Sequence, residues 1–122
     1  MSNPVGWFEI YVQDIARARA FYETVLHRQL EHLESPGIEM WAFAGDTTAT
    51  GTAGSLVHMP GVASGGNSTV VYFSCEDCAV EAGRVHDAGG SVFREKFSIG
   101  QYGFVALAHD PDGNLIGLHS LK

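Results

Sequence analysis

The chain has 122 residues, enough for one domain, and its 14 acidic against 7 basic residues give a formal net charge of −7. So few Lys and Arg residues cannot form the basic surface that nucleic acids or anionic membranes require, and no apolar run approaches the roughly 20 residues of a membrane-spanning helix. The N-terminal residues lack the pattern of a secretory signal, and the two cysteines are too close together to staple a fold, so we expect a cytoplasmic protein.

Residues 5–59 carry the pattern of one strand, one helix and three further strands. Val5 to Val12 alternates between two faces, which predicts a strand. One face has Phe8, Ile10 and Val12, and the other has Trp7, Glu9 and Tyr11. Asp14 is a suitable N-cap for a helix from Ile15 to Leu26, because its carboxylate can accept a bond from the first turn. Strands are then predicted over 30–34, 38–44 and 54–59, before a Gly- and Ser-rich connector at 60–68.

Residues 69–120 repeat this plan. A strand over 69–75, an N-cap at Asp77 and a helix over 78–88 precede strands over 91–97, 102–108 and 115–120. Asp14 and Asp77 are 63 residues apart, and so are Gly54 and Gly117, so the two halves align without a gap. We therefore predict a single α+β domain of two βαβββ modules, in which a curved mixed sheet forms a half-barrel with the helices outside and a cavity inside.

Two local motifs extend this reading to a family. Phe21-Tyr22 in the first helix, and Asp110-Pro111-Asp112-Gly113-Asn114 before the last strand, make the chain resemble the vicinal oxygen chelate superfamily of glyoxalase I, bleomycin-resistance proteins and extradiol dioxygenases. The likeness is greatest to its small glyoxalase-related bacterial members. Enzymes of that family hold a divalent metal, and the resemblance places the ligand positions at Trp7, Val70, Gly54 and Gly117. Because these side chains offer a metal no lone pair, we expect no resident metal.

Three polar residues are candidates for chemistry. Glu9 is predicted to point into the cavity, where it would serve as a general base or bond to a neighbouring side chain. His119 shares a strand face with Gly117 and would act as a general acid, contact a ligand, or face solvent. His58 is placed near the end of its strand as a ligand contact. A metal site shifted to Glu9, His58 and His119 is a further alternative.

Aromatic residues are predicted to form the wall of the cavity. With His58, the expected ligand-binding residues are Trp7, Tyr11, Trp41, Tyr72 and Phe104. The glycines at 54 and 117 would leave room beside them, and aromatic walls with a few polar groups are typical of small-molecule pockets. The alternative is that these rings simply fill the core.

The pair Cys75 and Cys78 lies between a strand and a helix N-terminus, as redox dithiols do. Cys75, however, lies on the apolar face of its strand, and Glu76 and Asp77 add negative charge that disfavours a thiolate. A structural role is therefore expected for both cysteines.

These observations give three functional hypotheses. The first is a protein that binds a small organic molecule without a metal, with Glu9 or His119 moving a proton if it is a lyase or isomerase. The second is a non-catalytic protein that sequesters its ligand. The third is a metal-dependent lyase or dioxygenase that uses the shifted ligands. A homodimer is expected in each case, because the fold exposes sheet edges that pairing would cover.

Overall fold

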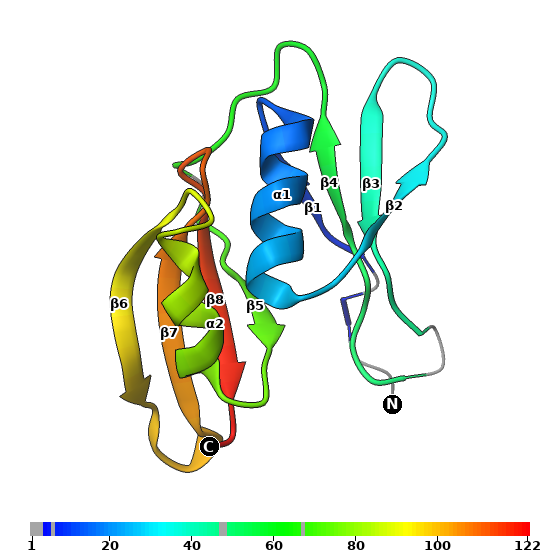
Figure 1. Ribbon diagram of the computed structural model, residues 1–122. Coiled ribbons are helices and arrows are strands. Elements are labelled where there is room, and N and C mark those ends of the chain that lie inside the picture. The colour runs from blue at the N-terminus through cyan, green and yellow to red at the C-terminus, as the bar shows by residue number, and fades with distance from the viewer. Residues whose placement is uncertain (1–3, 6, 47–48, 67) are drawn as a thin grey trace.

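The computed structural model describes residues 4–5, 7–46, 49–66 and 68–122 and shows two halves side by side (Figure 1). The first half contains β1 (Glu9–Tyr11), α1 (Ile15–Leu26), β2 (Leu30–Leu33), β3 (Glu39–Phe43) and β4 (Ser55–His58). The second contains β5 (Val71–Ser74), α2 (Cys78–Val85), β6 (Ser91–Ser98), the short 3-10 helix η1 (Gly100–Tyr102), β7 (Phe104–His109) and β8 (Leu115–Ser120). The predicted pair of βαβββ modules in an α+β fold is confirmed.

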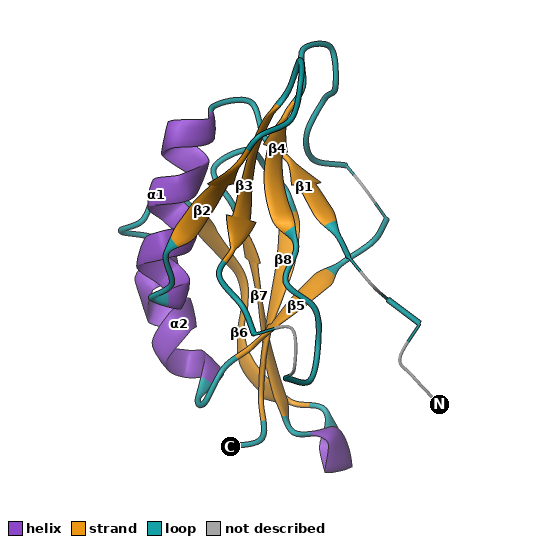
Figure 2. Ribbon diagram, turned by 90° about the vertical axis from the view of Figure 1, so that its right-hand side faces the viewer, coloured by secondary structure: helices purple, strands orange, loops and turns teal. Residues whose placement is uncertain are grey.

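Each half forms its own four-stranded sheet, with the strand orders β1-β4-β3-β2 and β5-β8-β7-β6. The pairs β1–β4 and β5–β8 are parallel and the other pairs are antiparallel. Both helices lie on one side of the two sheets (Figure 2). No helix in the described part of the chain is long and apolar enough to cross a membrane.

The register of the last strand corrects the ungapped repeat. Glu9 pairs with Ser55 in the first sheet, and Tyr72 pairs with Gly117 in the second. Glu9 and Tyr72 are 63 residues apart, but Ser55 and Gly117 are 62 apart. The hairpin closed by residues 110–114 is shorter than its counterpart, so Gly117 corresponds to Ser55 and not to Gly54. Gly54 therefore faces the opposite side of its sheet from the one that Gly117 faces.

Both predicted helix caps are confirmed. Asp14 accepts a hydrogen bond from the backbone N–H of Arg17 at 3.1 Å, and Asp77 accepts one from Ala79 at 3.1 Å. The Lys96 ammonium donates to Asp77 at 2.9 Å, and this bond, together with the one from Ala79, lowers the pKa of the Asp77 carboxyl. Local capping chemistry thus sets where each helix begins.

The two halves share one apolar core. Phe73 of β5 packs against three rings of the first half, with centroid distances of 6.1 Å to Phe8, 5.9 Å to Tyr22 and 5.4 Å to Phe43. Tyr22 and Phe43 are buried. Since a half of this size buries too little surface to be stable alone, these contacts between halves carry much of the hydrophobic stabilisation.

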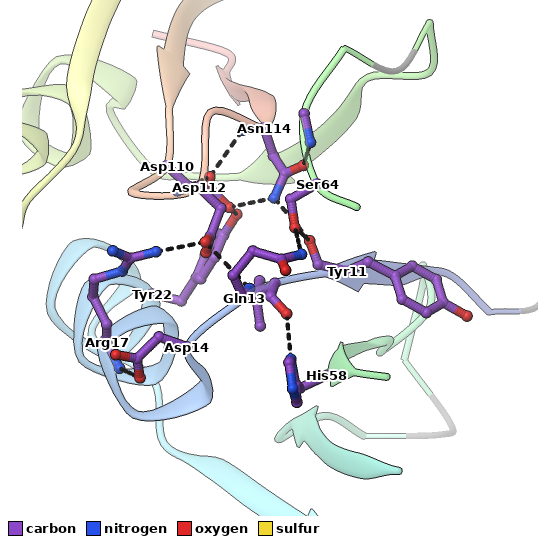
Figure 3. Close-up of polar contacts among 12 residues, drawn as sticks. Tyr11, Gln13, Asp14, Arg17, Tyr22, His58, Ser64, Asp110, Asp112 and Asn114 are labelled. Atoms are coloured by element: carbon purple, nitrogen blue, oxygen red, sulfur yellow. Dashed lines mark hydrogen bonds and ion pairs between the residues drawn. The ribbon is translucent and has the colours of Figure 1, made fainter. Parts of the chain in front are cut away.

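A polar network around Asp110 joins the turn before β8 to α1 (Figure 3). One oxygen of this buried carboxylate accepts the N–H groups of Asp112 and Asn114, each at 2.9 Å. The other accepts the Tyr22 hydroxyl at 2.7 Å and the Asn114 amide at 2.9 Å. Asp112, whose side chain is 1% exposed, pairs with Arg17 of α1 at 2.6 Å. Burial and the neighbouring Asp110 charge raise the pKa of Tyr22 well above its usual value, so it stays a donor.

The same turn holds the connector against β1. The Asn114 amide donates to the Tyr11 carbonyl at 3.2 Å, and the N–H of Gly65 donates to Asn114 Oδ1 at 2.8 Å. The Ser64 hydroxyl also donates to the Tyr11 carbonyl and accepts from Gln13 Nε2 at 2.8 Å. Figure 3 shows the Tyr11 backbone inside this network and its ring pointing away from it. Ser64 and Gly65 of the connector are therefore held against β1.

We predict that Tyr22→Phe lowers the free energy of unfolding by about 2 kcal/mol, because a hydrogen bond to a buried charged group is lost while the ring is retained. Chemical denaturation of the purified protein measures this difference. Tyr102→Phe is the matched control, since Tyr102 is 64% exposed, and it should change the free energy by less than about 0.5 kcal/mol. Equal stability of the two variants would contradict a role for Asp110 in joining the halves.

Candidate ligand-binding site

A cavity of about 380 Å³ lies between β1 and the edge of the second sheet. It is lined by Phe8, Glu9, Ile10, Tyr11, Ala63, Ser64, Gly65, Thr69, Val71, Asn114, Leu115 and Ile116. These residues come from β1, the connector, β5 and the start of β8, so both halves contribute. The volume falls within the range of small-molecule sites, and the wall is mainly apolar.

Glu9 and Tyr11 provide the chemistry of the β1 wall. They point to the same face of the strand, and the Tyr11 hydroxyl donates to Glu9 Oε1 at 2.9 Å. This hydrogen bond is the main cause that raises the pKa of Tyr11, followed by burial and the Glu9 charge. The structure thus places both predicted residues in the lining. Glu9 is nevertheless exposed, so it lacks the desolvation expected of a general base.

His119 and Tyr72 lie on the corresponding face of the second sheet but outside the cavity lining. His119 Nε2 is 2.7 Å from the carbonyl oxygen of Tyr102, which ties it to η1. Tyr72 lies over Gly117, where a Cβ would be 2.2 Å from the tyrosine ring. Gly117 therefore leaves no open room, because the Tyr72 ring occupies that space. Trp7 precedes β1, is 43% exposed and is likewise not in the lining.

Three other predicted ligand contacts lie outside the described lining of the cavity. Trp41 pairs with Leu56 and lies under the guanidinium of Arg19, at 3.5 Å from the ring centroid. The Nδ1 atom of His58 is 2.9 Å from the Val12 carbonyl oxygen. Phe104 pairs with Ser120 and lies 4.7 Å from the Lys96 ammonium. Strand alternation turns these side chains toward the helix-covered face, where they make the contacts just described and do not reach the cavity lining. Gly54 is on that face too, and the Phe8 ring fills its space.

The residues present do not fit the metal site that the family resemblance implies. Its positions carry Trp7, Val70 and Gly117, with Ser55 as the counterpart of Gly117 by register. Indole, alkyl and hydrogen side chains donate no lone pair, and a neutral hydroxyl is a poor ligand beside them. The shifted set is not brought together either, because His58 faces away from Glu9. Among the described residues, no three or more His, Cys, Asp or Glu side chains are grouped to hold a metal.

Several lining residues carry no functional prediction from the sequence. Ser64 and Gly65 lie in a Gly- and Ser-rich stretch whose composition predicts only a connector, and Asn114 lies in a motif that predicts a turn. An Asn that ends a tight turn before a strand has a side chain free to bond a neighbouring segment, and that signal could have found it.

The chain matches the model of the glyoxalase/bleomycin resistance protein/dioxygenase superfamily over residues 5–118. It belongs to this superfamily. A glyoxalase I mutant from Zea mays has a similar structure, with 22% sequence identity to this chain and a TM-score of 0.75. The alignment covers 96% of this chain and 46% of the Zea mays chain, so this chain spans about half the length of that protein. No curated protein matches the sequence.

Two neighbours of similar length give fuller coverage. An antibiotic binding protein from Streptomyces sp. CB03234 is 25% identical over 98% of this chain and 97% of its own, with a TM-score of 0.73. A glyoxylase/bleomycin resistance protein/dioxygenase domain from Frankia sp. EAN1pec aligns over 100% of both chains at 14% identity, with a TM-score of 0.76. The latter likeness shows the superfamily fold alone.

Cys75 has the properties of a structural thiol. Both cysteines are free, Cys78 is buried, and Cys75 is half-buried beside Glu81. Burial, reinforced by the charge of Glu81, raises the pKa of Cys75 to about 12. Since the thiolate is the reactive form, this environment opposes redox chemistry.

We predict that Cys75 resists alkylation by iodoacetamide in the native protein at pH 8. With a pKa of about 12 only roughly one thiol in ten thousand is ionised, so the rate should be at least about a hundredfold below that of an ordinary thiol. The rate should rise about tenfold per pH unit. Tandem mass spectrometry locates the label, and the protein unfolded in guanidinium is the control. Rapid native labelling would show that the thiol is activated.

Proposed function

We propose that this protein binds a small organic molecule, without a resident metal, in the cavity between β1 and the second sheet. The observation that carries the proposal is the cavity itself, whose β1 wall joins the apolar Phe8 to the hydrogen-bonded pair of Glu9 and Tyr11. A concave, mainly apolar wall with a few polar groups is the usual form of a small-molecule site. The full-length likeness to an antibiotic binding protein supports a binding role.

Sequestration of the ligand ranks above catalysis in this proposal. A reaction of the lyase or isomerase type would use Glu9 to accept a proton, and the hydrogen bond from Tyr11 holds Glu9 in one orientation for it. The exposure of Glu9 and the position of His119, which contacts η1 and not the cavity, both favour binding alone. Loss of turnover in Glu9→Gln with ligand affinity retained would instead identify an enzyme.

A cytoplasmic homodimer is part of the same proposal. Two free cysteines fit a reducing compartment, and β2 and β6 are outer edges of their sheets whose backbone groups a second copy can pair with.

We predict that an aromatic compound of drug size raises the melting temperature of the protein, by stabilisation of about 2.7 kcal/mol at a hundred times its dissociation constant. A thermal-shift screen followed by calorimetry identifies such compounds. Ala63→Phe, which places a ring in the lining, should abolish binding. Ala20→Phe, on the exposed surface of α1, is the control and should bind normally. Binding that survives Ala63→Phe would place the site elsewhere.

We also predict that the affinity for such a compound does not depend on a divalent metal. Dialysis against a chelator, with elemental analysis before and after, should leave the dissociation constant unchanged within about twofold, because the described lining has no set of side chains suited to coordinate a metal ion. Stoichiometric metal that is lost on dialysis together with binding would restore the metal-dependent hypothesis. His119→Ala would then show whether His119 is a ligand.

A further inference from the structure

The charge of the cavity lining has one sign. Glu9 is the only acidic residue in the described lining, and no Lys, Arg or His residue is part of it. Arg17, a cation of the Asp110 network, is held 2.6 Å from Asp112 on the α1 side, so its charge is already matched. The chain as a whole carries a formal charge of −7, which adds to the negative potential at this site.

The side-chain hydrogen-bond donors of Tyr11, Ser64 and Asn114 are already engaged. The Tyr11 hydroxyl donates to Glu9, and the Ser64 hydroxyl donates to the Tyr11 carbonyl. The Asn114 amide donates to the Tyr11 carbonyl and to Asp110. Thr69 also has an interaction partner. The lining side chains can therefore still accept hydrogen bonds. The main acceptors are the second carboxylate oxygen of Glu9 and the hydroxyl oxygen of Tyr11.

We infer that the ligand of this cavity is an organic cation, an apolar or aromatic body that carries an amidinium, guanidinium or ammonium group directed at Glu9. The inference rests on the proposed function and names its ligand class. Such a group supplies the donors that the lining lacks, and its charge is neutralised by Glu9 in a charge-assisted hydrogen bond. The Tyr11 ring beside Glu9 adds an aromatic face that attracts a cation.

An anionic ligand is disfavoured in this site. A carboxylate or phosphate needs donors, and the side-chain donors of Tyr11, Ser64 and Asn114 are spent within the protein. It would also meet the Glu9 charge, which repels it. The cavity therefore selects for positive charge both by attraction and by exclusion.

Three isosteric probes test this selection: biphenyl-4-carboxamidine, biphenyl-4-carboxamide and biphenyl-4-carboxylate. They share one apolar body and differ in charge. Calorimetric titration of the intact protein should show the amidine binding at least about tenfold more tightly than the amide, with the carboxylate weakest. The preference for the amidine should decrease as salt is added, because screening weakens the attraction to an exposed carboxylate.

The Glu9→Gln variant should bind amidine and amide with affinities within about threefold of each other, because the carboxylate that separates them is gone. Glu34→Gln makes the same change of charge at a side chain that is 95% exposed and outside the lining, and it should retain the wild-type preference. Circular dichroism confirms that both variants are folded.

The outcomes separate the ligand class from the proposed function. Binding of the amide or the carboxylate as tightly as the amidine, or an amidine preference that persists in Glu9→Gln, overturns the cationic ligand and leaves a binding protein. Failure of all three probes, together with failure of the wider aromatic screen, overturns the proposed function and the ligand class with it.

Discussion

The structure depends on one buried carboxylate whose four hydrogen bonds come from its own turn and from the helix of the other half. Asp110 would be costly to bury alone, but each oxygen has two donors, so these bonds offset the cost of its burial. Tyr22 contributes twice, since its ring belongs to the shared aromatic core and its hydroxyl to the carboxylate. Apolar packing and hydrogen bonding therefore join the two halves at the same place, the junction of Tyr22 and Asp110.

The position of the cavity follows from this junction. Because β1 and β5 are edge strands of separate sheets, the two halves meet through side chains and the connector and not through a shared ladder of backbone bonds. Asn114 and Ser64 hold the connector to the backbone of Tyr11, and the side chain of Tyr11 is left on the other side. Tyr11 is thus fixed by hydrogen bonds to its backbone carbonyl, while its ring remains available to line the cavity.

The sequence predicts those features of the fold that depend on interactions between residues close together in the chain. The two Asp caps, the bounds of the last strand and the shared face of Glu9 and Tyr11 follow from capping and alternation, and the structure has them all. The faces of Trp41, His58 and Phe104 could not be obtained this way, because they depend on how the strands pair and on which face the helices cover. The gap in the repeat depends on hairpin length, and it changes the offset between the two halves by only one residue. The contact of His119 with the backbone of η1 has no pattern in the sequence, since any residue supplies a carbonyl.

The ring of Tyr72 over Gly117 has a consequence for how the site can change. A longer side chain at 117 meets the tyrosine ring at once, whereas Tyr72 itself is 52% exposed, so a smaller residue at 72 opens the space above Gly117 to solvent. A carboxylate can therefore be accommodated at 117 once Tyr72 is replaced or its ring turns aside, so positions 72 and 117 are best varied together.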